Sequence, residues 1–484
     1  MKSKGKKKLK VKNTFAKRGY FFALIIAGIL GISSVSFLGL ELNSEELFFA
    51  ATTQNLKKSP KNPKASIVKS LFDENVTSSK KHSIEDSVKK KVGVKRAKAV
   101  KFSKDGFVDK VLPNGKVKIK RRLDLNLFPD KKFSAVQKNV KEKSSGHIVW
   151  KGSLAEDPLA MVHFVMKGDM VLGSVHSASL GAYEIYYEGD GIHSIREIDY
   201  NAFPRDIHLA STTPKPKRAN AKTTLTKKTS ASVATNIDVL MAYSRGFREW
   251  SDDQLQAHAE LRIAEANEIF SNSAIRINLR LAGAPYRTNY TAAGDVHTDL
   301  DRLFETNDTF LDDIPAVRDS RAADVTFLYV GSSDASACGV AYIMNRDNWD
   351  YFDWYAYAVG DGVCDGTFVF THELGHILGA HHDRDNSEGT IPPYDTYSYG
   401  YQNRDRSVRT VMSYRCPEQR NPNGCVLVPY FSTPLILYSP YNITIGTETE
   451  NNAKTLNETR RIVESFRSSG INIPMIHIPL LLDR

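Results

Sequence analysis

Three histidines and a glutamate stand at fixed intervals between His372 and Asp383. This segment reads His-Glu-Leu-Gly-His-Ile-Leu-Gly-Ala-His-His-Asp. Residues four apart share one face of a helix, so His372 and His376 can point at one ion from a single helical turn. Gly379 stands where a helix most often ends in a residue with positive φ, and the chain can then turn back to bring in His382. No other feature constrains the fold as strongly, because three imidazoles have to meet.

The donor set of this segment favours a catalytic zinc site. Three neutral imidazoles suit zinc and leave a fourth position open for water, unlike a closed structural site. Glu373 is the expected general base, since zinc lowers the pKa of its water and a nearby carboxylate can take the proton. Asp383 is expected to hold His382 through a hydrogen bond. His381 is expected to point elsewhere, as a surface residue or a residue behind the ligands.

The segment resembles the zinc motif of the metzincin clan of metalloproteases. Those enzymes carry a methionine-containing turn beneath the metal, and Met412 in Val-Met-Ser-Tyr lies 30 residues past His382. The resemblance implies an α/β metzincin-like catalytic domain with a twisted mixed sheet, a zinc-binding active-site helix and this Met-turn. Tyr414 resembles a tyrosine that some metzincins place near the metal, where it could ligate zinc or stabilise an oxyanion. The alternative is a buried tyrosine with an anchored hydroxyl.

The resemblance can be narrowed within the clan. His382-Asp383 ends the motif as in adamalysin-like (reprolysin-like) proteases, and residues 409–416, 430–434 and 452–460 are similar to bacterial peptidyl-Asp metalloendopeptidases. This similarity spans residues 236–467. It implies protein or peptide substrates with Asp preferred on the primed side of the scissile bond. Such a preference requires a cation in the pocket that binds this Asp side chain. The candidates are Arg409, Arg415 and Arg420, although a solvent-facing arginine is the commoner outcome.

Charge divides the chain into a basic front and an acidic back. Residues 1–228 hold 45 of the 66 Lys and Arg but only 21 of the 55 Asp and Glu. An intramolecular partner would use this asymmetry, so we expect a basic prodomain to dock on an acidic catalytic domain. Nucleic-acid binding is the less favoured explanation of the net charge of +11. Solvated lysine-rich segments are the alternative for parts of residues 55–101.

The N-terminus has the pattern of an export signal. Residues 1–18 carry nine Lys or Arg and no acid, and the run Tyr20–Leu40 is uncharged. A positive end before an apolar run is typical of export, and we assign residues 1–50 to it. Cleavage near Ala50-Ala51 would give a secreted protein. The alternative is an uncleaved membrane anchor, because 21 apolar residues can span a bilayer.

The rest of the chain divides by composition and periodicity. We expect a flexible basic linker at 51–101, a small β-rich prodomain at 102–210 and a basic processing linker at 211–235, with an uncut tether as the alternative for the last. The catalytic domain follows at 236–467, then an apolar tail at 468–484. Within 102–210, the runs 162–166 and 171–175 bracket a turn as in a hairpin. In the catalytic domain we expect strands at 237–243, 275–281 and 325–330, a helix capped by Ser251, and the zinc helix at 367–378.

The cysteines all lie in the catalytic half. In an exported protein, four cysteines predict two disulfides, and Cys338–Cys364 with Cys416–Cys425 is the simplest of three pairings. The prodomain contains no cysteine, so latency cannot use a thiolate on the zinc. A carboxylate (Asp199 and Asp206 are candidates), another histidine or steric occlusion remain.

A second metal site is conceivable after the zinc motif. Asp383, Asp385, Asn386 and Glu388 gather oxygen donors that could bind calcium, although they lack the spacing and glycine of an EF-hand. A hydrated acidic loop is the favoured alternative.

The sequence as a whole predicts an exported zymogen of a zinc-dependent endopeptidase. The alternative is a non-catalytic, zinc-stabilised module that binds a surface through its basic half. An inert site would not need Glu373, which favours the enzyme.

Overall fold

The computed structural model describes residues 34–37, 40–43, 69–113, 117–204, 233–247, 249–331, 337–387, 391–403, 405, 408–416 and 424–467. Two units are distinguished, Met1–Ile67 and Val68–Arg484. In the first, β1 (Ser34–Phe37) and β2 (Leu40–Asn43) form an antiparallel pair. The rest of the expected export signal, residues 205–232 (which include most of the processing linker expected at 211–235) and the C-terminal tail lie outside the described residues. Among the described helices, none is both long and apolar enough to cross a bilayer.

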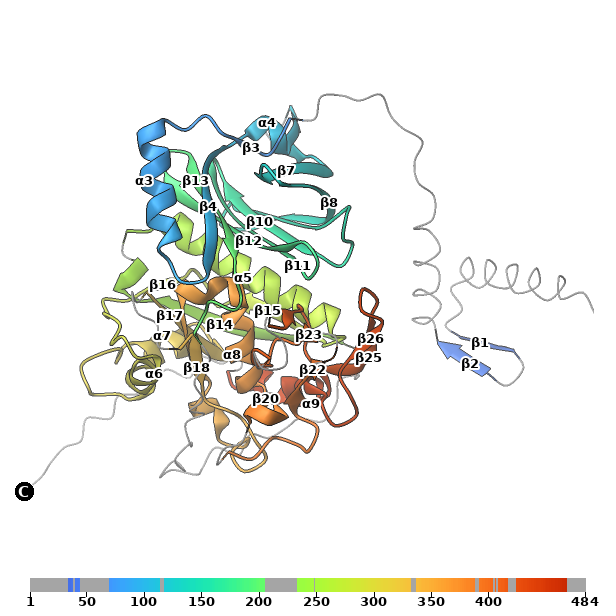
Figure 1. Cartoon of the computed structure of the whole chain (residues 1–484). Helices are drawn as coiled ribbons and strands as arrows, with labels where there is room; N and C mark the ends of the chain where they lie inside the picture. The colour runs from blue at the N-terminus through green and yellow to red at the C-terminus, as the bar shows by residue number, and fades with distance from the viewer. Residues whose placement is uncertain are drawn as a thin grey trace, which may run out of the picture. The chain divides into compact units, whose positions relative to one another are not determined.

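The N-terminal part of the second unit is β-rich (Figure 1). Nine antiparallel strands form one sheet in the order β3-β4-β13-β12-β11-β10-β9-β8-β7. Their bounds are β3 Phe72–Asp73, β4 Val94–Phe102, β7 Arg122–Phe128, β8 Lys131–Glu142, β9 Ile148–Leu154, β10 Met161–Lys167, β11 Met170–Ser177, β12 Gly181–Gly189 and β13 Ile192–Ile198. The short α4 (Lys104–Phe107) leads into a separate hairpin, β5 (Val108–Val111) and β6 (Val117–Ile119). The predicted hairpin is confirmed, with Val162 opposite Val175 in β10 and β11.

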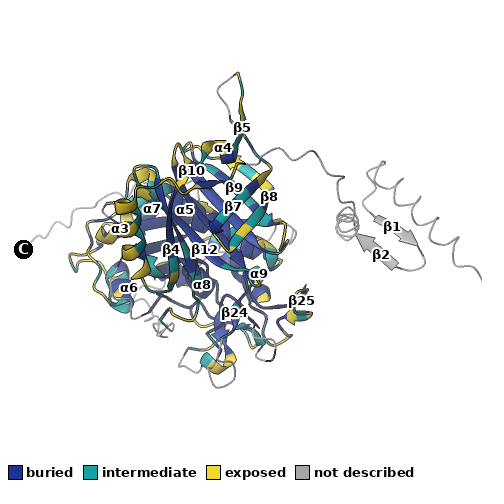
Figure 2. Cartoon of the chain, turned by 45° about the horizontal axis from the view of Figure 1, so that its top comes forward, coloured by how far each residue is buried: buried dark blue, intermediate teal, exposed yellow. Residues whose placement is uncertain are grey.

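The flexible linker expected at 51–101 is wrong from β3 onward. Helix α3 (Ser78–Lys89) packs on β4, and β4 pairs with β13 along its length. Figure 2 shows the outer face of α3 exposed, and Val88 is its one buried residue. The high lysine content of these elements indicates a solvated linker. An ion pair makes the folded sheet compatible with such a composition, since the Lys98 ammonium lies 2.7 Å from the carboxylate of Glu74. The β-rich region therefore begins about 30 residues earlier than composition indicates.

A second sheet of six strands follows, of mixed direction as expected. Its order is β15-β14-β17-β19-β18, with β16 also pairing β14. All pairs are parallel except that of β18, an antiparallel edge strand. The bounds are β14 Thr235–Tyr243, β15 Ile277–Leu281, β16 Tyr286–Arg287, β17 Val325–Val330, β18 Gly339–Ala341 and β19 Tyr357–Asp361. Every residue of β17 is buried, as in a strand covered on both faces.

Helices and short strands complete this region. The helices are α5 Asp252–Asn272, α6 Val296–Phe304, α7 Ile314–Ser320, α8 Val369–Ile377 and α9 Asn452–Glu464, with 3-10 turns η2 Arg245–Phe247, η3 Phe352–Trp354, η4 Gly362–Thr367 and η5 Arg384–Asn386. Short strand pairs and triplets are formed by β20 His381–Asp383, β21 Tyr399–Gly400, β22 Gln402–Asn403, β23 Val408–Arg409, β24 Val426–Leu427, β25 Thr433–Tyr438 and β26 Ile443–Ile445. The predicted strands and the helix capped by Ser251 are confirmed, the latter with a capping box to Gln254.

Helix α5 lies between the two sheets. It contacts β9, β10 and β11 on one side and β15 on the other (Figure 1). Its apolar stripe packs into the core of the second sheet, as the 3.6-residue period predicts. Its charged residues Glu260, Arg262, Glu265 and Glu268 are also buried, because the first sheet covers them. The helix is thus enclosed on two faces, one apolar and one ionic.

The ionic face of α5 is where the basic front meets the acidic back. Lys143 lies 2.5 Å from Glu260, and Lys138 lies 3.2 Å from Glu268. Buried His163 also lies 2.8 Å from Glu268 and, together with Lys138 and against the effect of burial, lowers the pKa of that carboxyl to about 2. The charge asymmetry of the sequence is therefore used between these two regions.

Candidate active site

Helix α8 carries His372, Glu373 and His376. The helix begins after Phe368, whose φ of +63° is in the left-handed region. It ends just before Gly379, whose φ of +88° confirms the expected glycine turn. Beyond this turn β20 runs back past the helix and presents His382 to the two histidines of α8.

The three imidazoles converge through one nitrogen each. The Nε2 atom of His382 lies 2.9 Å from that of His372 and 3.0 Å from that of His376. Three ligands at zinc–nitrogen distances of ~2.0–2.1 Å on a tetrahedral ion would stand ~3.3 Å apart, close to these values. All three rings are buried. The arrangement is therefore compact enough for one ion.

Hydrogen bonds at the opposite ring nitrogens orient two of these histidines. His372 Nδ1 lies 2.8 Å from the carbonyl oxygen of Val411, and His376 Nδ1 lies 2.8 Å from that of Ala380. A carbonyl can only accept, so each Nδ1 carries the proton and each Nε2 presents a lone pair. Two neutral imidazoles are thus held ready for a metal by the backbone.

Glu373 lies on the same helix with its side chain toward the edge strand β18. Its residue is 2% exposed. A Cβ built at Gly339 of β18 would stand 2.6 Å from Oε1 of Glu373, too close for the carboxylate to stay in this position. Gly339 therefore leaves room for this carboxylate. Sequence reasoning missed Gly339, because its role arises only when β18 and α8 are brought together.

Met412 packs under α8. It is fully buried, and a Cβ at Gly375 would stand 2.5 Å from its sulfur. Gly375 sits between the two helical histidines, so its missing side chain admits the methionine directly beneath them. The histidine motif does not specify the residue at position 375. The available hint was a glycine in the middle of a helix, which costs about 1 kcal/mol relative to alanine.

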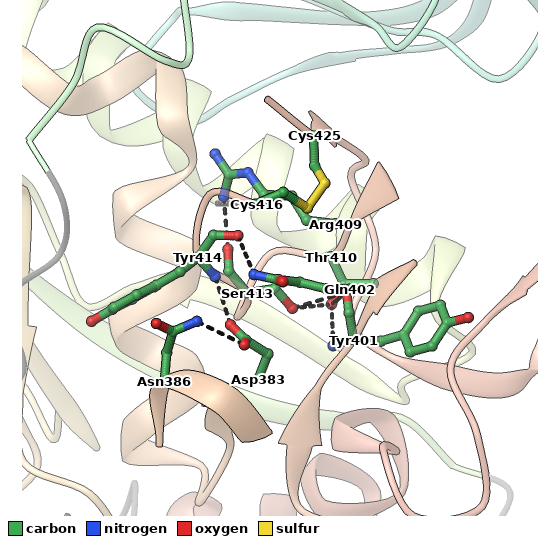
Figure 3. Close-up of a disulfide and its surroundings, with 10 residues drawn as sticks. All are labelled: Asp383, Asn386, Tyr401, Gln402, Arg409, Thr410, Ser413, Tyr414, Cys416 and Cys425. Carbon is green, nitrogen blue, oxygen red and sulfur yellow. Dashed lines mark hydrogen bonds between the residues drawn. A yellow bond between two sulfur atoms is a disulfide. The ribbon is translucent and has the colours of Figure 1, made fainter. Parts of the chain in front are cut away.

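Asp383 connects the turn after α8 to the segment that follows Met412 (Figure 3). Its Oδ2 accepts a hydrogen bond from the backbone N–H of Tyr414 at 2.9 Å, and its Oδ1 accepts one from Asn386 Nδ2 at 2.8 Å. The Tyr414 ring is half-buried, with its centroid 4.7 Å from that of His382. Asp383 thus positions the tyrosine beside the third histidine.

The three arginines proposed for specificity differ in their surroundings. Arg409 is buried, and its Nη1 donates to the carbonyl of Ser413 at 2.7 Å, so it braces the Met412 turn. Arg415 is half-buried, and its Nη1 donates to the carbonyl of Asn201, in the loop after β13. Arg420 lies outside the described residues. Arg415 is thus contacted by the N-terminal region through Asn201.

Both expected disulfides are present, Cys338–Cys364 and Cys416–Cys425. The first joins the start of β18 to η4, which precedes α8. The second closes the loop after Tyr414 and Arg415 (Figure 3). Each disulfide therefore fixes a segment beside the histidine cluster.

The surface position considered for His381 is wrong. Its residue is 4% exposed, and burial lowers the pKa of its imidazole to about 4. The alternation of side chains along β20 turns His381 away from His382 and into the interior, near Tyr399.

The oxygen donors considered for calcium are only partly described, because Glu388 lies outside the described residues. Those groups of described residues that could hold a metal do not include Asp383 or Asp385.

Comparison with known proteins identifies the region around this site. Residues 233–423 match the family model described as Metallo-peptidase family M12 (Reprolysin_5). We call these residues, which match the metallopeptidase family model, the M12 domain. The mixed α/β content of the M12 domain and the β-rich region before it agree with the predicted fold class.

Two bacterial relatives extend the similarity beyond the M12 domain. The peptidyl-Asp metalloendopeptidase of Xanthomonas campestris pv. campestris is 29% identical over 351 residues, covering 69% of this chain and 79% of that protein. The protein of the same name from Stenotrophomonas maltophilia (strain R551-3) is 28% identical over 354 residues, covering 69% and 81%. Among solved structures, metalloproteinase-II from Bacteroides fragilis overlaps with a TM-score of 0.32 at 12% identity, over 57% of this chain and 85% of that one. The family assignment does not depend on this weak overlap.

The residues of the M12 domain fit zinc, the metal that peptidases of this family use. The donor set is three buried imidazoles, with two Nε2 lone pairs fixed by backbone carbonyls. Nitrogen donors in a set of three are typical of catalytic zinc. His372, His376 and His382 would hold the ion.

Proposed function

We propose that the chain is a zinc-dependent endopeptidase, made as an exported zymogen. The observation that carries the proposal is the convergence of three Nε2 atoms next to a buried glutamate on the same helical turn, within an M12 domain. A structural zinc site would be closed by a fourth protein ligand and would not need this carboxylate. The assignments of His372, His376 and His382 as ligands and of Glu373 as base follow.

The chemistry divides between the metal and the protein. When bound, zinc supplies a Lewis acid that acidifies water and polarises the scissile carbonyl. Glu373 follows His372 on the helix, and its carboxylate lies toward β18 beside the histidine cluster. From this position it accepts the proton of the attacking water and delivers it to the leaving amine. Tyr414 lies beside His382 and donates its phenolic O–H to the developing oxyanion. Asp383 keeps Tyr414 in place.

The edge strand β18 supports an extended peptide as the substrate. Among the described residues it pairs with β19 alone, which leaves its other edge for a peptide strand. Peptides bind such edges through main-chain hydrogen bonds that do not depend on sequence. Gly339 of this strand lies against Glu373, so a peptide added there would pass the general base.

Preference for Asp at the primed side is the finer part of the proposal. It rests on the names of the relatives and on Arg415, which follows Tyr414 by one residue. Arg415 donates to the Asn201 carbonyl in the uncut chain. A carboxylate of the substrate would replace that carbonyl as a stronger, charged acceptor. The buried Arg409 is the weaker candidate, because it is already engaged with Ser413.

The β-rich region serves as the prodomain in this proposal. Its last residues reach the site, since Asn201 contacts Arg415, and its ion pairs with α5 hold it on the M12 domain. Latency then comes from occlusion of the primed side, without a thiolate. Cutting in the basic linker between 211 and 235 would allow release. Secretion is supported by the disulfides and by the basic, then apolar, N-terminus.

The test uses the full chain, matured by its own processing or by added trypsin. Casein and a peptide library are incubated with the parent, with Glu373→Ala and with Glu448→Ala, a matched change at an exposed glutamate. We expect Glu373→Ala to lose activity by at least ~10³-fold, with zinc retained at the triad and Glu448→Ala unaffected. Enrichment of Asp at one primed subsite is expected in the library.

Two results would oppose the proposal separately. Equal cleavage by Glu373→Ala would reject Glu373 as the general base, whereas no cleavage by the matured parent would leave a non-catalytic zinc module as the explanation. A library with no enrichment of Asp would reject only the specificity.

A further inference from the structure

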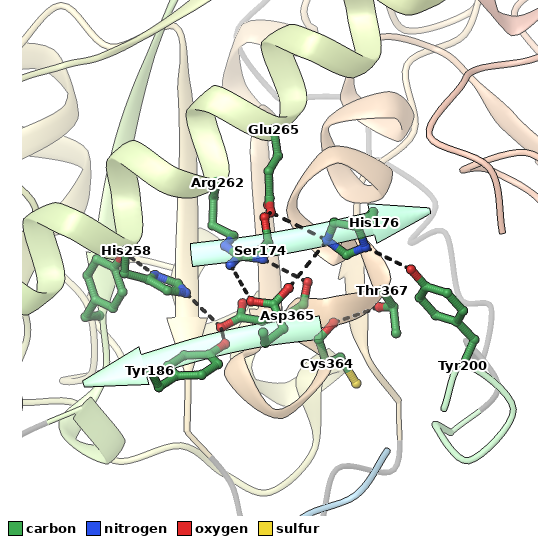
Figure 4. Close-up of polar contacts among 12 residues, drawn as sticks. Ser174, His176, Tyr186, Tyr200, His258, Arg262, Glu265, Cys364, Asp365 and Thr367 are labelled. Atoms are coloured by element: carbon green, nitrogen blue, oxygen red, sulfur yellow. Dashed lines mark hydrogen bonds and ion pairs between the residues drawn. The ribbon is translucent and has the colours of Figure 1, made fainter. Parts of the chain in front are cut away.

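A second cluster of buried metal-type ligands lies between the β-rich region and α5. It consists of His176 on β11, Glu184 on β12 and Glu265 on α5. Their side chains are at most 2% exposed. One candidate ligand atom from each lies within 4.8 Å of the others. Figure 4 shows the His176 ring and Glu265 converging from opposite sides of the interface.

In each of the two glutamates, one carboxylate oxygen contacts Arg262 and the other points toward His176. Each uses Oε2 to pair with the Arg262 guanidinium, at 3.0 Å in both cases. Each turns Oε1 toward His176, at 3.5 Å from Nε2 for Glu184 and 3.7 Å for Glu265. These separations are too long for good hydrogen bonds. They are close to the ~3.3 Å expected between nitrogen and oxygen ligands of one tetrahedral zinc.

Two of the converging atoms lack a hydrogen-bond partner among the described residues. His176 Nε2 and Glu184 Oε1 are buried and have no hydrogen bond. Nδ1 of the same ring lies 2.9 Å from the Tyr200 hydroxyl, which can accept a hydrogen bond from Nδ1–H, and this tautomer leaves a lone pair on Nε2. Glu265 Oε1 accepts a hydrogen bond from Ser174. Buried polar atoms without hydrogen bonds are rare, and a bound ion is one of the few explanations.

The local charge matches a divalent cation. Glu184, Glu265 and the nearby buried Asp365 supply three carboxylates, and Arg262 is the one guanidinium between them. His258 Nε2 pairs with Asp365 at 2.8 Å. Arg262 then remains to balance both Glu184 and Glu265, so at least one negative charge is left over in a dry interface, which is costly. A divalent ion would neutralise this charge.

We propose that His176, Glu184 and Glu265 form a second zinc site, which joins the β-rich region to α5. Nitrogen and carboxylate donors suit zinc better than calcium or magnesium. Two ligands come from the β-rich region and one from the M12 domain, so the site exists only while both are in place. Zinc there would stabilise the uncut chain and be lost on separation. The site does not depend on the chain being a peptidase.

A proton is the competing occupant. Burial opposes a charge on His176, but Tyr200, Glu184 and Glu265 together raise the pKa of its imidazole well above the usual range. A doubly protonated His176 would replace part of the missing positive charge without any metal. Zinc binding must therefore displace a proton and weaken at low pH.

The test counts zinc in the full uncut chain after equilibration with zinc and removal of the excess. We expect two ions in the parent, one in His372→Ala/His376→Ala, and none when Glu184→Gln is added to that double variant. His82→Ala, at an exposed histidine of α3, serves as the control and keeps two ions. In the double variant, added zinc is also expected to raise the thermal unfolding temperature, and Glu184→Gln to abolish that rise.

The outcomes separate the two sites. A double variant that binds no zinc while the parent binds one overturns the second site and leaves His176 protonated. A double variant that still binds two ions leaves the second site standing and opposes the histidine triad. Glu184→Gln keeps the side-chain shape, and this variant is discarded only if its circular dichroism spectrum shows that it is unfolded. In that case the zinc-edge absorption spectrum of the His372→Ala/His376→Ala variant decides. One imidazole with oxygen ligands around the zinc supports the site, and three imidazoles contradict it.

Discussion

Gly339→Ala is expected to damage catalysis without removing the metal. The new methyl would stand 2.6 Å from Oε1 of Glu373, 2.8 Å from Cγ2 of Val369 and 2.9 Å from the backbone oxygen of Val359. Ordinary contacts begin near 3.4 Å, so something must move by about 0.8 Å. The carboxylate is the end of a flexible side chain, whereas the Val359 oxygen belongs to the sheet. Glu373 is therefore the group that yields.

A displacement of this size matters for a general base. A misplacement of about 1 Å can reduce a rate by ~10²-fold, and overpacking costs about 1–3 kcal/mol of stability. We expect kcat to fall by roughly that factor while the zinc content stays unchanged. The assay compares kcat, KM and bound zinc with those of Gly294→Ala, where no atom lies within 4 Å of the new Cβ and only the positive φ is strained. Unchanged kcat in Gly339→Ala, or loss of zinc, would refute the proposed location of Glu373.

Three further predictions concern packing, pH and charge. Gly375→Ala should lower the free energy of unfolding by about 1–3 kcal/mol in urea, because the methyl meets the sulfur of Met412 and this outweighs the ~1 kcal/mol gained in helix propensity; a more stable variant would contradict it. Burial lowers the pKa of His193 to about 4 from ~6.5 in the unfolded chain, so its contribution to stability is present above pH 6.5 and lost as pH falls to 4, a loss of about 3 kcal/mol. His193→Phe should show a correspondingly shallower acid dependence in urea titrations at pH 7 and 4, and an identical dependence would sink the idea. Lys143→Ala should destabilise the full chain by about 1–3 kcal/mol, since Glu260 would stay buried without its cation; no change at low salt would show that the pair contributes nothing.

Local patterns in the sequence were sufficient for the M12 domain. The strand at 237–243, the Ser251 cap and the turn at Gly379 each depend on neighbouring residues, and each is confirmed. The histidine spacing indicated a cluster because a helix fixes the positions of i and i+4. Both disulfides followed from nearness in sequence.

What could not be predicted depends on contacts between distant segments. Lysine-rich β4 looked like a solvated linker, since nothing in its own sequence shows that Glu74 would pair with Lys98. The burial of the charged residues of α5 could not be predicted from the helix alone, because the sheet that covers them comes from about 100 residues earlier in the chain. Gly339 and Gly375 acquire their roles only through Glu373 and Met412.

A zinc-edge anomalous difference map from crystals of the full chain tests the central claim most directly. We expect a peak at ~2.0–2.1 Å from Nε2 of His372, His376 and His382, with the remaining position taken by water or by a bound peptide. No peak among these rings, or a fourth protein atom fixed at ligand distance with and without peptide, would contradict the account.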